Sequence, residues 1–203
     1  MNVINGKRGW TKMRDKYMKQ LENLNNNMIE MGAMIEKSIE NAISALVRQD
    51  VETAKKAIEY DAEIDEMEKN IENMCMKILL SQQPVASDLR TVSSALKMVT
   101  DMERIGDHAA DISEITIMMA DKPYRCKLEK IEKMAKETMI MLVQSIESYV
   151  NKDIEKAKAV INHDDIVDGL FDEVKKALIV AIKDDDEDGE QMADLLMVAK
   201  YLE

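Results

Sequence analysis

The chain has 203 residues and a formal charge of −12, and its composition is 46% hydrophobic, 33% charged and only 3% aromatic. This acidic balance argues against nucleic acid as a partner, because phosphate backbones are bound by basic faces. No apolar run is long enough to span a membrane, no signal peptide is visible, and the two cysteines lie far apart. We therefore expect a cytoplasmic protein without a membrane segment of its own.

The residues in excess predict an all-α protein, because Met, Ala, Leu, Glu and Lys favour helices whereas aromatic strand formers are scarce. Apolar residues at helical spacing predict a first long helix through Leu21–Leu46 and a second through Ile64–Ile78. A turn at Pro84 separates the second helix from a third over 89–119. Residues 121–123 then close the first half of the chain.

The second half repeats this plan, with helices predicted over 124–150, 153–183 and 188–203 and an acidic turn over 184–189. Segments that correspond in the two halves support an internal repeat. They are residues 50–55 with 153–158, and residues 96–103 with 196–203.

These repeats predict an all-α fold of two tandem, pseudo-symmetric three-helix bundles. The first bundle is expected over 13–121 and the second over 122–203. Residues 1–12 are expected to form an N-terminal extension, for which disorder is the expectation.

Two pairs of acidic residues, each four positions apart, lie in the second and third helices of the first half. They are Asp61 with Asp65, and Glu103 with Asp107. Like charges at this spacing cost a helix roughly 0.2–0.5 kcal/mol unless a cation offsets them. Both pairs lie at matching distances from Pro84, so an antiparallel helix pair should bring them together. The sequence predicts a four-carboxylate metal site at the surface; the alternative is an ordinary solvated acidic flank.

The second half carries a shorter version of this set, made of Asp164, Asp168 and Glu203. The chain stops at Glu203, so the residue that would complete the second pair is absent. The last helix is therefore predicted to be truncated and the second site to lack a ligand.

Three segments of the chain resemble the signature of the PhoU family. They are Tyr60–Asp65, Ser81–Arg90 and Glu103–His108. The resemblance implies two three-helix bundles whose carboxylate motifs bind metal clusters, with iron or zinc as the expected metals. Carried onto this sequence, it implies one site at Asp61, Asp65, Glu103 and Asp107 and a second at Asp164, Asp168 and Glu203.

The same resemblance implies a cytoplasmic regulator of phosphate uptake that holds the phosphate-starvation response off. It would act by contact with the ATPase subunit of the phosphate ABC transporter and with a sensor histidine kinase, and it would reach the membrane only through these partners. A homodimer is expected, catalysis is not, and the chain contains no P-loop or Ser-His-Asp set that would indicate an enzyme.

Two other functions remain open from the sequence. A di-iron carboxylate oxidoreductase would use Glu-x-x-His on its helices, but Ile105 and Val160 stand three residues before the two histidines. A helical adaptor that binds its partners without metal is the third hypothesis.

Overall fold

The computed structural model forms six helices in the part of the chain that it describes. The described backbone comprises residues 3–82, 84, 86–184 and 189–203, and the described side chains are those of 14–81, 84, 86–182 and 189–203. The helices are α1 (Val3–Arg48), α2 (Val51–Gln82), α3 (Ser87–Met118), α4 (Glu129–Asn151), α5 (Ile154–Asp184) and α6 (Gly189–Leu202). None of the described helices is long and apolar enough to cross a membrane.

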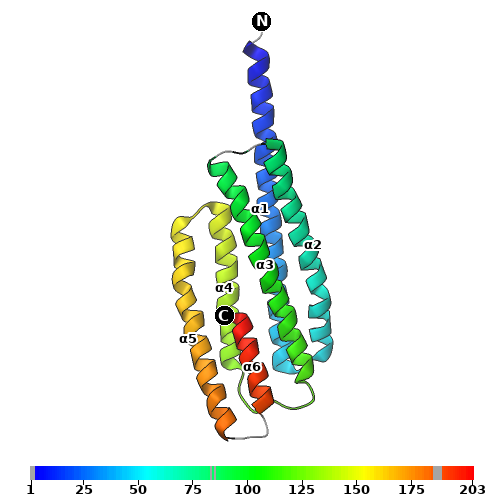
Figure 1. Cartoon of the computed structure of the whole chain (residues 1–203), viewed down its shortest axis with the longest axis vertical. Coiled ribbons are helices and arrows are strands. Elements are labelled where there is room, and N and C mark those ends of the chain that lie inside the picture. The colour runs from blue at the N-terminus through cyan, green and yellow to red at the C-terminus, as the bar shows by residue number, and fades with distance from the viewer. Residues whose placement is uncertain (1–2, 83, 85, 185–188) are drawn as a thin grey trace.

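The predicted all-α class and the two three-helix bundles are confirmed (Figure 1). Helices α1–α3 pack together as one bundle and α4–α6 as the other. α1 begins at Val3, so residues 3–12 of the expected N-terminal extension have a helical backbone that continues the first helix. The acidic run of residues 185–188 lies outside the described residues.

The segment that links the two bundles is longer than predicted, because α4 begins at Glu129 and not near residue 124. Gln49 holds this link in place: its amide Nε2 donates to the carbonyl oxygens of Met119 (3.2 Å) and Lys122 (2.6 Å). Pro123 has no amide hydrogen to donate to a helix. Both features favour a turn where hydrophobic periodicity alone predicted helix.

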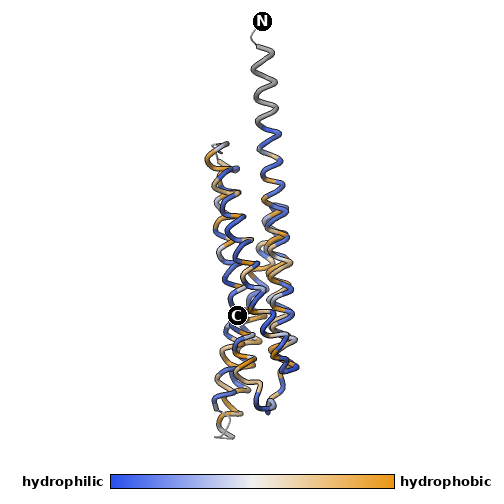
Figure 2. Tube along the Cα trace, turned by 90° about the vertical axis from the view of Figure 1, so that its right-hand side faces the viewer, coloured by the Kyte–Doolittle hydropathy of each residue, from blue (hydrophilic) through white to orange (hydrophobic). Residues whose placement is uncertain are grey.

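Each helix buries one apolar stripe, as the spacing predicts. On α1 the side chains of Leu24, Met28, Met31 and Ile35 are fully buried, at steps of three and four residues. Figure 2 shows the same alternation of hydrophobic and hydrophilic residues along the helices. The stripes of α1, α2 and α3 meet in one core, which continues into the second bundle.

The internal repeat is visible in the turns that open α2 and α5. Gln49 and Lys152 both adopt left-handed backbone conformations, with φ of 53° and 54°. The next residue then caps the helix: Asp50 accepts the backbone amides of Glu52 and Thr53, and Asp153 accepts that of Lys156. The hydrogen bonds from Thr53 lower the pKa of Asp50.

The two bundles meet where α1 packs on α4 and α3 packs on α6. Gly32 on α1 makes the first contact possible, because a Cβ atom at this position would overlap Cδ1 of Ile146 on α4. The second contact includes a ring stack between His108 and Tyr201, whose centroids lie 4.9 Å apart. The tyrosine hydroxyl of Tyr149 also donates to the carbonyl oxygen of Thr91 (3.1 Å).

Substitution Gly32→Ala tests this interface. Although alanine favours helices, it would force the terminal methyl of buried Ile146 to move, so the free energy of unfolding should fall by about 1 kcal/mol, measured by urea denaturation. Ile146→Val removes the overlapping Cδ1 and should restore part of the loss in a double-mutant cycle. Gly169→Ala is the matched control: nothing lies within 4 Å of its Cβ position, so it should stabilise by roughly 0.5–1 kcal/mol. Additive effects of Gly32→Ala and Ile146→Val would contradict the proposed contact.

Candidate metal centre

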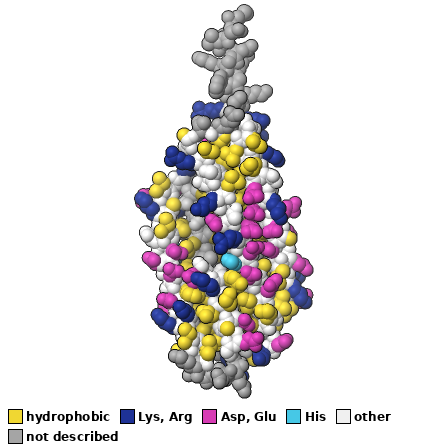
Figure 3. All heavy atoms as spheres, in the orientation of Figure 1, with side chains coloured by type: hydrophobic (Ala, Val, Ile, Leu, Met, Phe, Trp, Pro, Cys, Tyr) yellow, Lys and Arg dark blue, Asp and Glu magenta, His cyan; other side chains and the backbone are white. Residues whose placement is uncertain are grey.

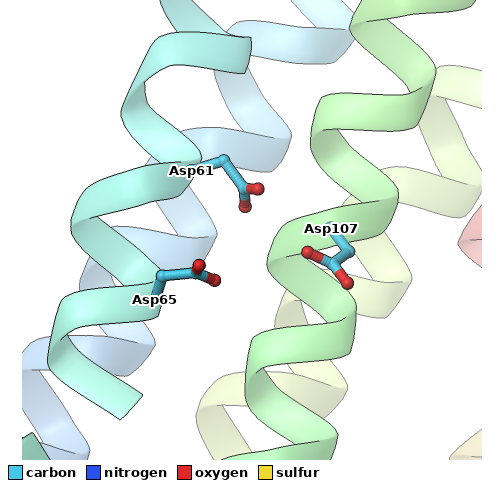
Figure 4. Close-up of side chains that lie close together, drawn as sticks. All are labelled: Asp61, Asp65 and Asp107. Carbon is cyan, nitrogen blue, oxygen red and sulfur yellow. The ribbon is translucent and has the colours of Figure 1, made fainter. Parts of the chain in front are cut away.

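Three aspartates from two helices converge in the first bundle. Asp61 and Asp65 on α2 face Asp107 on α3 (Figure 4). One carboxylate oxygen from each lies within 4.8 Å of those of the other two. The structure therefore brings together three of the four acids that the sequence grouped. Among the described residues, these three form the one cluster of His, Cys, Asp or Glu side chains whose ligand atoms lie close enough to hold a metal ion.

The close approach of α2 and α3 explains this convergence. Gly106 lies beside Ile64: a Cβ added at residue 106 would stand 3.0 Å from Cγ2 of Ile64 and 3.5 Å from Oδ1 of Asp61. A side chain at residue 106 would therefore require Ile64 to move by a few tenths of an ångström at the level of the carboxylates. Gly106, which costs α3 helical propensity, thus lies where α2 and α3 pack closely beside the aspartates.

Burial and mutual repulsion raise the pKa values of Asp61 and Asp107. For Asp61, burial is the main cause, followed by the charges of Asp107 and Asp65. For Asp107, burial again comes first, and Asp65 and Asp111 add to it. Oδ1 of Asp61 is shielded from solvent and has no hydrogen-bond partner among the described residues. Such an oxygen is costly to bury alone and suits a hard cation.

Glu103 lies at the edge of this cluster and does not join the three-oxygen group. Its pKa is raised by burial and then by the charges of Asp107 and of three acids on α2. One of these is Glu68, whose own pKa is raised by burial, by Glu72 and by Asp65. The acidic surface that Figure 3 shows over α2 and α3 is therefore wider than the predicted four residues.

Glu68 and Asp111 are the residues that sequence reasoning missed. Their helical spacing could have indicated them, because each lies one turn further along the same helix face as the predicted acids. On α2 the acids follow at 61, 65, 68 and 72, and on α3 at 103, 107, 111 and 114. Lys69 pairs with this set through its Nζ, which lies 3.5 Å from Oδ2 of Asp65. Both side chains of that pair are well exposed, so it offsets little of the repulsion.

The second predicted set is arranged differently. Asp164 and Asp168 are exposed on α5, and Glu203 pairs with Lys200 of its own helix at 2.9 Å. Within the described residues these three acids do not form a group like that of the first bundle.

Both histidines have other contacts. His108 stacks on Tyr201, and its Nδ1 lies 3.6 Å from Oδ2 of Asp111. Nε2 of His163 lies 2.8 Å from Oε2 of Glu137, which joins α5 to α4. The candidate centre is thus made of carboxylate oxygens, which are the donors that hard divalent and trivalent ions prefer.

Comparison with known proteins places both halves of the chain in one family. The model of the PhoU domain matches residues 28–116 and 131–203. Among curated relatives, the phosphate-specific transport system accessory protein PhoU homolog of Clostridium acetobutylicum is 35% identical over 191 residues, which are 94% of this chain and 87% of that protein. The PhoU protein of Escherichia coli K12 is 29% identical over 184 residues, 91% of this chain and 76% of that protein.

Solved structures agree with the fold. The crystal structure of PhoU from Pseudomonas aeruginosa superposes with a TM-score of 0.87 at 26% identity and covers 92% of this chain and 90% of its own. The phosphate transport system regulatory protein PhoU from Streptococcus pneumoniae gives a TM-score of 0.84 at 25% identity, with 92% and 87% covered.

The raised pKa values predict how stability depends on pH. A carboxyl group whose pKa is higher in the folded state binds its proton more tightly there, so the free energy of unfolding falls as pH rises from about 4 through the raised values. At neutral pH the metal-free protein therefore carries the full repulsion. Asp107→Asn should raise its stability at pH 7 by roughly 0.5–1 kcal/mol, because several like-charge pairs disappear.

Urea denaturation between about pH 4 and 7.5, with a chelator present, measures this effect. The stability of Asp107→Asn should also depend less on pH than that of the wild type. Asp172 is an exposed acid on α5, outside the carboxylate cluster. Asp172→Asn is therefore the control and should change the free energy of unfolding by no more than about 0.5 kcal/mol. Loss of stability in Asp107→Asn at pH 7 would contradict the account.

Proposed function

The chain belongs to the PhoU family, and on this basis we propose that it is an accessory protein of phosphate transport that holds the phosphate-starvation response off when phosphate is plentiful. The observation that carries the proposal is the family match over both repeats, together with the fold it shares with PhoU crystal structures. The relatives are named as accessory or regulatory proteins, which supports regulation and not catalysis.

The regulator would act by protein contact in the cytoplasm, as a homodimer. Its proposed partners are the ATPase subunit of the phosphate ABC transporter and a sensor histidine kinase. The names of the relatives support an association with the transport system. The strong negative charge of the chain suits binding to proteins and argues against binding to nucleic acid.

A metal ion in the first bundle is the second part of the proposal. Asp61, Asp65 and Asp107 would hold the ion, with Glu103 beside them, and iron or zinc are the expected metals. The fit rests on the three converging carboxylates and on the buried Oδ1 of Asp61 that lacks a partner. A bound cation would neutralise the repulsion and tie α2 to α3, so that the surface offered to a partner becomes more rigid.

The second set of acids stays a prediction. Asp164, Asp168 and Glu203 would form a weaker site, because Asp164 and Asp168 are exposed and Glu203 already pairs with Lys200. The two sets can be separated experimentally, since they lie on different helices and in different bundles.

Metal analysis of the purified protein tests both sets. After incubation with zinc or ferrous iron and desalting, wild-type protein should retain metal when measured by mass spectrometry. Asp61→Asn/Asp107→Asn should lose most of it, because two of three converging ligands lose their charge. Asp164→Asn/Asp168→Asn is the matched double variant and should lose much less. Equal metal in the wild type and in the first variant would rule the proposed site out.

Reporter and co-purification assays test the regulatory role. Deleting the gene in its own host should raise a phosphate-starvation reporter in phosphate-rich medium, and the tagged protein should co-purify with the transporter ATPase and the kinase. Adding a chelator should weaken co-purification; unchanged binding would favour the metal-independent adaptor. An unchanged reporter with no co-purification would refute the regulatory role itself.

A further inference from the structure

A groove lies between α1 and α2 on the first bundle. Its volume is about 840 Å³, and it is lined by residues from the middle parts of these two helices. Asn70 on α2 donates through Nδ2 to Oδ1 of Asn27 on α1 (3.2 Å), which ties the helices together at this level. In the described part of the chain α6 packs on neither α1 nor α2, so the groove is shaped by the first bundle.

The floor of the groove is apolar. Met34 on α1 and Met67 and Tyr60 on α2 line it, and all three are half-buried and pack against the core. Lys37 on α1 places its Nζ 5.2 Å from the centroid of the Tyr60 ring, so the aromatic face beside the groove already accepts one cation. Methionine side chains adapt their shape to a neighbour, which suits a floor that receives side chains of another helix.

The rim of the groove is acidic. Glu30 on α1 and Glu63 and Glu66 on α2 are exposed there, and within the described residues none of the three forms an ion pair. Lys69 also lines the groove, but its Nζ lies 3.5 Å from Oδ2 of Asp65 and pairs with that carboxylate. A negative rim over an apolar floor is complementary to a basic helix.

The side of α1 that carries Glu30 becomes basic toward the N-terminus. Residues at steps of three, four and seven share one side of a helix, and from Glu30 these steps lead to Asn23, Lys19 and Lys16, which are all exposed. Lys12 continues the series in the sequence. Figure 1 shows α1 passing beyond the ends of α2 and α3 at this end of the molecule. One side of α1 is thus basic at one end and acidic at the groove.

We propose that this groove is the contact surface between two copies of the chain, with the basic N-terminal part of α1 of each protomer seated in the acidic groove of its partner. A two-fold axis beside Asn23 sets Lys16 of one protomer opposite Glu30 of the other, because both lie seven residues from Asn23. The same axis repeats the contact at the other groove, so the interface closes on itself. A parallel arrangement would oppose like charges, which is unfavourable.

This surface rests on the homodimer proposed above and adds where its protomers meet. It leaves the candidate metal centre accessible, because Glu63 is turned about 160° around α2 from both Asp61 and Asp65, at 100° per residue. Since the paired charges are exposed, the dimer should dissociate more readily as the salt concentration rises.

Sedimentation equilibrium of the full chain measures the dissociation constant of the dimer. Lys16→Glu/Lys19→Glu should raise it at least about tenfold, because attractions at both grooves become repulsions. Glu63→Lys/Glu66→Lys should raise it as well, although this variant brings the net charge of the chain closer to zero. The variant that combines all four substitutions should regain much of the wild-type affinity, because the complementary charges are then exchanged.

Lys175→Glu/Lys176→Glu is the matched control. Both lysines are exposed on α5, and the variant gains the same negative charge as Lys16→Glu/Lys19→Glu. Its dissociation constant should stay close to that of the wild type. Circular dichroism of all variants, expected to match the wild type, excludes loss of the fold as the reason for weaker association.

Three results would overturn the proposed surface. One is an unchanged dissociation constant in Lys16→Glu/Lys19→Glu. Another is an equal loss of affinity in that variant and in the control on α5. The third is a combined variant that associates no better than either of its parents. Each of these leaves the homodimer itself standing, whereas a wild type that is monomeric at every concentration would refute the homodimer and this surface together.

Discussion

The register of α2 against α3 is the constraint on which the candidate centre depends. The two helices run antiparallel on either side of the turn at Pro84, so residues at equal distances from it face each other. Gly106 then lets the helices approach until Ile64 fills the space beside it. Because the apolar stripes of both helices must be buried in the same core, the register cannot slip without exposing them. The positions of Asp61, Asp65 and Asp107 follow from that packing.

The same packing creates an electrostatic cost. Acids that would be harmless on separate helices are brought together and partly withdrawn from water, and the pKa values of Asp61, Glu103 and Asp107 rise. Hydrophobic burial is large enough to hold the helices together against this repulsion. The cation that we propose for this site would stabilise the folded state, so its binding and the local rigidity would be coupled through one helix pair.

The second bundle repeats the local structure of the first but arranges its acids differently. Its turn at Lys152 and its cap at Asp153 repeat those at Gln49 and Asp50. Asp164 and Asp168 are exposed on α5, and within the described residues they do not form a group like that of Asp61, Asp65 and Asp107. Two bundles with nearly the same plan therefore differ in how their carboxylates are placed.

The sequence by itself determined the helices, the repeat and the pairing of Asp61 and Asp65 with Asp107, because apolar periodicity, a proline turn and residue counting depend only on local geometry. It placed the start of α4 too early, since the bonds from Gln49 to the linking segment join residues far apart in the chain. Only the tertiary structure decided that Glu103 stays at the edge of the cluster. It also decided that the charges of Glu68 and Asp111 act on the carboxyl groups of the cluster. The side-chain positions that fix these distances depend on how closely two helices pack, and that closeness is set by Gly106 and Ile64 together.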